Sequence, residues 1–242
     1  MKKYPRTANY DPDWISENWM GPHPLWLLEE LCENLTLRPG MKVLDMGCGK
    51  GLTSVFLAKE YGVTVFANDL WISAMDNQRR FEEAGVADRA FPIHAEAHAL
   101  PYAEGFFDAA ISVDSYHYYG ADEAYFPCIF SKLVRSGGQF GIVVPGFTGE
   151  FEKGYPETLK NFWAEDMFSF HSGAWWKKLW EKTGLAEVTA CYDFDDPKEA
   201  WRPWAKWARE HLGFNDDDFL EADTDGDVAL IMMAAKKRGE NE

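Results

Sequence analysis

Apolar residues follow two alternating patterns along most of the chain. Short unbroken apolar runs alternate with segments in which apolar residues recur every three or four positions. The unbroken runs predict buried strands, and the three- and four-residue spacing predicts amphipathic helices. The predicted strands are 42–46, 63–67, 90–94, 109–113, 139–144, 186–192 and 227–236. The predicted helices are 24–35, 52–61, 73–84, 124–133 and 173–182.

The order of these elements indicates the fold class. Strand and helix alternate from residue 42 to residue 144, and the strands lack the apolar–polar alternation of a sheet with one solvated face. This pattern is typical of a parallel sheet with helices on both faces. We therefore expect an α/β protein with a doubly wound sheet.

Three segments do not follow this plan. Residues 1–36 combine an aromatic arm, which we expect to be irregular over its first 22 residues, with the helix that begins at Pro24. Segments 145–172 and 193–225 are rich in aromatic and acidic residues, so we expect cap-like insertions over one end of the sheet. The chain of 242 residues has the size of a single domain, 1–242.

Composition narrows the classes of partner. The chain has 40 acidic against 24 basic residues, a formal charge of −16 that repels phosphate backbones and disfavours nucleic acid as a partner. The longest apolar stretch, 228–235, is too short for a membrane span, and the start of the chain lacks the apolar core of a secretory signal. Four scattered cysteines without a CxxC pair are typical of reduced thiols. We expect a cytoplasmic protein with no nucleic-acid or membrane partner, and its oligomeric state stays open.

A glycine-rich turn follows the first predicted strand. Residues 43–51 read VLDMGCGKG, and Asp69 ends the next strand. Ligands of open parallel sheets bind outside the carboxyl ends of the strands, and glycines let a ligand approach backbone N–H groups closely. The Asp69 carboxylate either accepts hydrogen bonds from a ribose diol or caps a helix, and its place after this turn favours ribose.

Two nucleotide motifs fit this turn poorly. A phosphate-binding Walker A loop needs Ser or Thr after its lysine, but Gly51 follows Lys50. A nicotinamide fingerprint needs a third glycine at position 52, where the chain has Leu52. The remaining pattern is DxGxGxG, which runs from Asp45 to Gly51.

From residue 43 to residue 144 the chain resembles a class I S-adenosylmethionine-dependent methyltransferase of the small-molecule branch. The matching segments, in the family's order and spacing, are 43–51, Asp69-Leu70, 95–102, 106–112 and 133–138. The resemblance implies a Rossmann-like, seven-stranded sheet that is mostly parallel with an antiparallel last strand. The predicted strand at 227–236 agrees with that arrangement.

The resemblance also implies a cofactor site for S-adenosyl-L-methionine. Gly47 and Gly49 would line its methionine half, and Asp114 with Ser115 would lie near its amino group. Asp69 would bind the ribose. The remaining residues of this expected site are Leu70 and Trp71 against the adenine, Glu96 and the backbone of Ala97 at the adenine amino group, and the loop residues Asp45 and Gly51.

The acceptor side of the site is expected among aromatic residues. Aromatics make up 16% of the chain and include 11 Trp, of which we assign about half to the core. His117 is the candidate general base, and the alternative is that it only packs or orients a neighbour. The spacing of His94, Glu96 and His98 does not complete a metal site, so no metal is expected. The candidate acceptor pocket consists of Trp14, Trp19, Tyr118, Phe147 and His171.

These observations favour one function over two alternatives. We expect methyl transfer from S-adenosylmethionine to a small-molecule acceptor by in-line displacement, which depends on positioning and desolvation. The alternatives are an NAD(P)-dependent oxidoreductase, which the misplaced third glycine disfavours, and a non-catalytic cofactor-binding regulator. Binding of NADH or binding without turnover would distinguish them.

Overall fold

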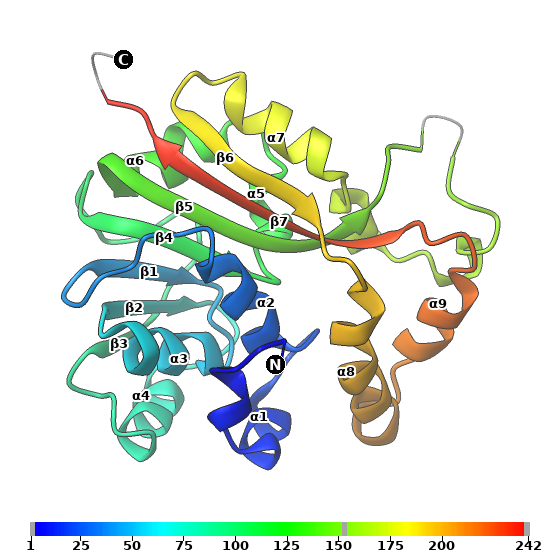
Figure 1. Cartoon of the computed structure of the whole chain (residues 1–242), viewed down its shortest axis with the longest axis horizontal. Coiled ribbons are helices and arrows are strands. Elements are labelled where there is room, and N and C mark those ends of the chain that lie inside the picture. Colours follow the sequence, from blue (N-terminus) through cyan, green and yellow to red (C-terminus); the bar gives the residue numbers. More distant parts are fainter. Residues whose placement is uncertain (1–2, 152–153, 240–242) are drawn as a thin grey trace.

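A computed structural model describes residues 3–151 and 154–239 of the chain. Its strands form one sheet in the order β3-β2-β1-β4-β5-β7-β6 (Figure 1). Neighbouring strands from β3 to β5 run parallel, whereas β7 runs antiparallel to both β5 and β6. This confirms the predicted seven-stranded sheet. The strands are β1 (Lys42–Met46), β2 (Thr64–Asp69), β3 (Ala90–His94), β4 (Phe107–Val113), β5 (Val134–Phe147), β6 (Ala186–Asp193) and β7 (Val228–Lys237).

Two apolar clusters cover the two faces of this sheet. On β1, Val43 belongs to one cluster and Leu44 to the other, so the strand is buried on both sides. The first cluster contains α2 (Pro24–Cys32), α3 (Leu52–Tyr61), α4 (Ala74–Glu83) and α8 (Pro197–Leu212). The second contains α6 (Ser131–Leu133) and α7 (Gly173–Glu181). Burial on both faces explains why the strands read as unbroken apolar runs.

One predicted helix differs from the structure. The expected helix 124–133 is a π-helical turn, η2 (Phe126–Phe130), followed by the single turn of α6. Pro127 lies in the first turn of η2, where an amide hydrogen would have no partner within the helix. β5 then begins earlier than expected, because Val134 pairs with Phe107 before the register shifts.

The N-terminal arm is more regular than its sequence indicates. The expectation of an irregular arm is wrong for α1 (Pro12–Asn18), which follows the short turn η1 (Thr7–Asn9). The Asp11 side chain accepts a hydrogen bond from the Asp13 amide, and Pro12 occupies the first turn, both of which favour a helix start. In the last turn of α1, the Glu17 carbonyl accepts a hydrogen bond from the Lys50 ammonium (2.9 Å), which holds the arm against the glycine-rich turn.

Most of the remaining elements follow the carboxyl ends of β5 and β6. Residues after β5 form the turns η3 (Lys160–Phe162) and η4 (Glu165–Ser169), and α8 and α9 (Asp216–Ala222) follow β6 (Figure 1). The arm contacts α8 directly: the Trp19 ring lies 6.4 Å from the Trp204 ring, and the His23 amide donates to the Ala200 carbonyl (2.8 Å). Within the described ranges, no helix is both long and apolar enough to span a membrane. The short helix α5 (His117–Gly120) follows β4.

The segment after η4 packs closely against Gly146 of β5. A Cβ at Gly146 would lie 2.3 Å from the His171 carbonyl oxygen and 2.4 Å from Ile231 Cδ1. We expect Gly146→Ala to lower the free energy of unfolding by about 1–3 kcal/mol, because the backbone must shift to admit the methyl group. Gly149→Ala is the matched control, since its Cβ would have no neighbour within 4 Å. Urea unfolding measures both, and equal stabilities would contradict the close approach.

Candidate functional site

The glycine-rich turn joins β1 to α3 in a conformation that only glycine adopts readily. Gly47, Gly49 and Gly51 have φ values of 71°, 53° and 82°. A Cβ at Gly47 would lie 1.9 Å from the Ser115 hydroxyl oxygen. The Gly47 amide donates to the Asn68 carbonyl at the end of β2 (2.9 Å). The turn is therefore fitted between the ends of β2 and β4.

Asp45 of β1 stabilises the start of α3, the helix that follows this turn. Its side chain is fully buried, and its Oδ2 accepts hydrogen bonds from Thr53 Oγ1 (2.7 Å) and Ser54 Oγ (2.6 Å). Burial raises the pKa of the Asp45 carboxyl to about 6. Asp45 thus ties β1 to the first turn of α3.

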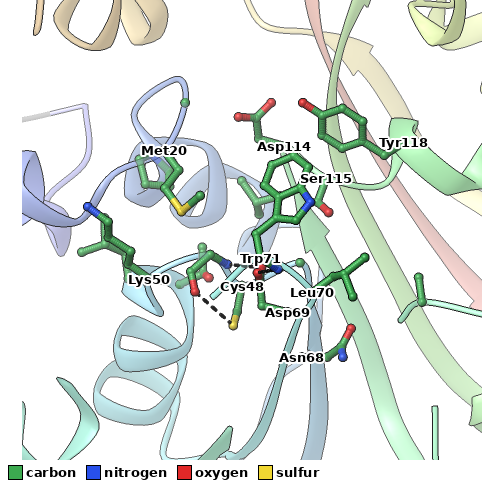
Figure 2. Close-up of a pocket in the computed structure, with 18 of the residues that line it drawn as sticks. Met20, Cys48, Lys50, Asn68, Asp69, Leu70, Trp71, Asp114, Ser115 and Tyr118 are labelled. Carbon is green, nitrogen blue, oxygen red and sulfur yellow. Dashed lines mark hydrogen bonds between the residues drawn. The ribbon is translucent and has the colours of Figure 1, made fainter. Parts of the chain in front are cut away.

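Asp69 joins the turn after β1 to the turn after β2. Its Oδ2 accepts from the Gly49 amide (2.8 Å), and its Oδ1 accepts from the Trp71 amide (2.8 Å) (Figure 2). Oδ1 also accepts from the Ile72 amide (2.9 Å). A carboxylate oxygen accepts about two hydrogen bonds, so Oδ2 retains one acceptor position. Asp69 therefore organises the two loops and can still accept a hydroxyl from a ligand.

Asp114 has an unusual backbone at the end of β4. Of the non-glycine residues that the structure describes, it alone has a positive φ, 55°. A Cβ at Gly21 would lie 1.9 Å from Asp114 Oδ2, so the carboxylate rests against the backbone of the arm. Such a conformation costs on the order of 1–3 kcal/mol and is concentrated at functional sites.

The loop after β3 carries a second acidic group. Glu96 Oε2 accepts from the His98 amide (2.8 Å), and Oε1 is hydrogen bonded to His98 Nδ1 (2.7 Å), which lowers the pKa of the Glu96 carboxyl. His94 instead contacts the Leu70 carbonyl through Nε2 (2.7 Å). His98 is therefore paired with Glu96, whereas His94 contacts a backbone carbonyl of the loop after β2.

These loops surround one cavity, which we call the strand-end cavity. Its volume is about 180 Å³, and it lies where β1, β2 and β4 end (Figure 2). The arm forms its opposite wall, with Met20 at the glycine-rich turn. Eleven of the residues expected from the sequence line it: Trp19, Gly47, Gly49, Asp69, Leu70, Trp71, Glu96, Ala97, Asp114, Ser115 and Tyr118.

The chain matches known proteins over the part that carries this cavity. Residues 43–138 match the sequence model of the family described as a methyltransferase domain. Methyltransferase GfsG from Streptomyces halstedii is 32% identical over 118 residues, which cover 48% of this chain and 42% of the relative. A sarcosine/dimethylglycine N-methyltransferase from Halorhodospira halochloris is 36% identical over 107 residues, or 43% of this chain and 37% of the relative.

Residues 43–138, which we call the methyltransferase domain, are thus similar in sequence to known methyltransferases. The chain spans about two fifths of the length of these two curated relatives. The fold around the methyltransferase domain also has known counterparts. Geranyl diphosphate C-methyltransferase from Streptomyces coelicolor A3(2), solved with S-adenosyl-L-homocysteine, superposes with a TM-score of 0.70 at 16% identity and covers 87% of this chain and 79% of its own.

Several expected residues lie outside the strand-end cavity of this methyltransferase domain. Asp45 lies beneath it, and Gly51 begins α3, where a Cβ would meet the Phe81 ring at 2.5 Å. His117 is buried, and burial lowers its pKa to about 3. Like His117, Trp14 lines neither cavity, whereas Phe147 and His171 line a different one.

Sequence reasoning identified Trp19 of the arm as a pocket residue but missed the other arm residues that line this cavity. Asn18, Met20 and Gly21 line it from the arm, Lys50 lines it from the glycine-rich turn, and Asn68 lines it from the end of β2. The Arg80 side chain of α4 donates to Asn18 Oδ1 (3.2 Å), a contact between positions 62 residues apart in the sequence. Of these unexpected residues, only Lys50 lies in a motif that the sequence shows, the glycine-rich turn. Burial lowers the pKa of the Lys50 ammonium.

The raised pKa of Asp45 predicts a pH-dependent stability. The folded state favours the protonated acid, so this contribution to stability is present below the unfolded pKa of about 3.9 and is lost as pH rises through about 6. We expect the stability of Asp45→Asn relative to the natural chain to rise by about 1–3 kcal/mol between pH 4 and pH 7. Urea unfolding at several pH values measures this difference.

The matched control for this experiment is the exposed acid Asp76. Hydrogen bonds from Ser73 and Arg79 lower the pKa of its carboxyl, so Asp76→Asn changes no titration between pH 5 and pH 7. A stability difference for Asp45→Asn that stays constant with pH would contradict the assignment of Asp45 as a buried acid.

Proposed function

We propose that this chain transfers a methyl group from S-adenosyl-L-methionine to a small-molecule acceptor, with the cofactor in the strand-end cavity. The observation that carries the proposal is Asp69. It ends β2, lies against the glycine-rich turn and keeps one acceptor position on Oδ2 inside the cavity. That position suits a ribose hydroxyl, and the surrounding residues 43–138 match methyltransferase domains.

The methionine half of the cofactor would lie along the glycine-rich turn. Side chains at Gly47 or Gly49 would occupy space against Ser115 and Met20, so the turn leaves backbone rather than side chain facing the cavity. Asp114 and the Ser115 hydroxyl lie at the end of β4, where they would receive the amino group of the methionine half.

The adenosine half would lie between the loops after β2 and β3. Leu70 and Trp71 line this side of the cavity as apolar surfaces against the adenine. Glu96 and the Ala97 backbone line the adjacent wall, where they would face the adenine amino group. The chemistry of these residues therefore suits both halves of the cofactor.

The chain's own residues would favour the transfer by holding the reactants and excluding water. When bound, S-adenosylmethionine supplies an electrophilic methyl group on a positively charged sulfur. Carboxylates such as Asp114 and aromatic faces such as Tyr118 stabilise a positive charge in this cavity. Displacement at such a methyl group depends on alignment of the acceptor, which the walls of the cavity provide.

We assign His117 a packing role in this proposal. Its ring contacts Tyr118 (4.1 Å between centroids) and Phe170 (5.7 Å), and its Nδ1 has no hydrogen-bond partner within the described residues. With a pKa of about 3, the imidazole accepts a proton poorly at neutral pH. The packing alternative is therefore favoured over the general base.

Other features of the chain support the same assignment. The formal charge of −16 disfavours nucleic acid as the methyl acceptor. We also propose that the arm and segments 145–172 and 193–225 form a cap over this end of the sheet as parts of one domain, supported by the contact between Trp19 and Trp204. The four free cysteines support a reducing compartment such as the cytoplasm.

Calorimetric titration with S-adenosylmethionine, S-adenosylhomocysteine and NADH tests this proposal. We expect micromolar binding of the first two ligands and at least about tenfold weaker binding by Asp69→Asn, because the charged acceptor for the ribose is lost. Asp76→Asn, an exposed acid at the start of α4, is the matched control and should bind normally.

The other outcomes of the titration have definite meanings. Binding of NADH alone would contradict the proposal and favour an oxidoreductase. Normal cofactor binding without turnover on any phenol, amine or thiol acceptor would favour a non-catalytic regulator. Thermal melting of Asp69→Asn separates a binding defect from loss of the fold, since this side chain also accepts hydrogen bonds from three backbone amides.

A further inference from the structure

A second and larger cavity lies among the residues that follow β5. Its volume is about 600 Å³, against about 180 Å³ for the strand-end cavity. Cavities of several hundred Å³ with mainly apolar walls are typical of small-molecule sites. We call it the aromatic cavity, because its lining includes Phe147, Phe151, Tyr155, Trp163, Phe168 and Phe170.

The rings of this cavity pack edge to face against one another. Phe147 lies 5.1 Å from Phe151, and Trp163 lies 3.9 Å from Tyr155 and 4.7 Å from Phe168. Phe168 is nevertheless 74% exposed, although it is a large apolar side chain. An apolar ligand in the cavity would remove such surface from water and so gain binding free energy.

The charged groups in the wall, Glu150 and Lys160, already have hydrogen-bond or ion-pair partners. Glu150 Oε1 accepts from the Ser172 amide (2.7 Å) and hydroxyl (2.8 Å), and Oε2 is hydrogen bonded to His171 Nδ1 (2.9 Å). Lys160 forms an ion pair with Glu157. A charged ligand would have to compete for these groups, whereas a neutral apolar ligand would leave them in place.

Three rings in contact link the linings of the two cavities. Phe170 lines the aromatic cavity and contacts the His117 ring, and His117 contacts Tyr118, which lines the strand-end cavity. A ligand in the aromatic cavity is therefore close to the place where the cofactor would lie. This arrangement suits a molecule with an apolar body and one reactive end.

We propose that the aromatic cavity holds the body of the methyl acceptor, and that this acceptor is a neutral molecule with an aromatic ring or hydrocarbon frame. The proposal rests on the proposed function. It also selects between the two acceptor classes that an aromatic lining permits, apolar and cationic. The paired state of Glu150 and Lys160 selects the neutral class.

Two probes of the same shape test this choice. 4-tert-Butylphenol is neutral, and (4-hydroxyphenyl)trimethylammonium replaces its quaternary carbon with a charged nitrogen. We expect the full chain without cofactor to bind the neutral probe at least tenfold more tightly in a calorimetric or NMR titration. Equal or tighter binding of the cationic probe would overturn the proposed class.

Two variants test whether the neutral probe binds in the aromatic cavity. Phe168→Asp adds a charge at an exposed position, and Gly149→Leu adds a side chain where a Cβ has no neighbour within 4 Å, so both should fold. Each is expected to weaken binding of the neutral probe at least tenfold. Phe214→Asp is the matched control, because Phe214 is 51% exposed and lies outside the cavity lining. Unchanged binding by the first two variants would overturn the site.

The same samples are titrated with S-adenosylhomocysteine, which separates the two proposals. We expect its affinity to be unchanged in all three variants. Probe binding without binding of S-adenosylhomocysteine would contradict the proposed function and show only an apolar binding site. Binding of S-adenosylhomocysteine without probe binding would remove only the acceptor site inferred here.

Discussion

The carboxylate of Asp69 holds together the two loops on which the strand-end cavity depends. β1 and β2 are parallel neighbours with Met46 opposite Asn68, so the turns that follow them emerge side by side. Asp69 accepts hydrogen bonds from Gly49 in the first turn and from Trp71 and Ile72 in the second. Without that acceptor, three backbone amides at the edge of the cavity would need other partners. The Asp69 carboxylate that shapes the site is thus also the group that we propose binds the ribose of the ligand.

The arm completes the same site from the other end of the sequence. Gly21 lets the backbone approach the Asp114 carboxylate, and Asn18 contacts Arg80 of α4. Much of the aromatic surplus serves this closure, because Trp19 packs against Trp204 and Trp207 of α8. Other Trp residues lie in the core, as Trp176 and Trp180 do on the opposite face of the sheet. The methyltransferase domain therefore supplies the loops, and the surrounding segments supply the walls.

The parts of this site that could be predicted are those with local causes. The glycine-rich turn and Asp69 follow strands that were readable as apolar runs, and the cavity forms where those strands end. α1 was missed although Asp11 and Pro12 carry a helix-start signal, because the helix has only seven residues and no clean apolar period. Met20 and Gly21 reach the cavity through contacts distant in sequence, which no local pattern contains. His117 has the right place in the sequence, yet its burial follows from packing against Phe170.

Hydrogen–deuterium exchange with and without S-adenosylhomocysteine tests the central claim most directly, namely that the loops and the arm together enclose one cofactor site. The account predicts that the ligand slows amide exchange in three separate segments: the glycine-rich turn at 47–51, the loop at 69–72 and the arm at 18–24. Exchange on α7, which packs on the opposite face of the sheet, should not change. Slowed exchange in the loops without any in the arm, or no change in any of the three segments, would contradict the account.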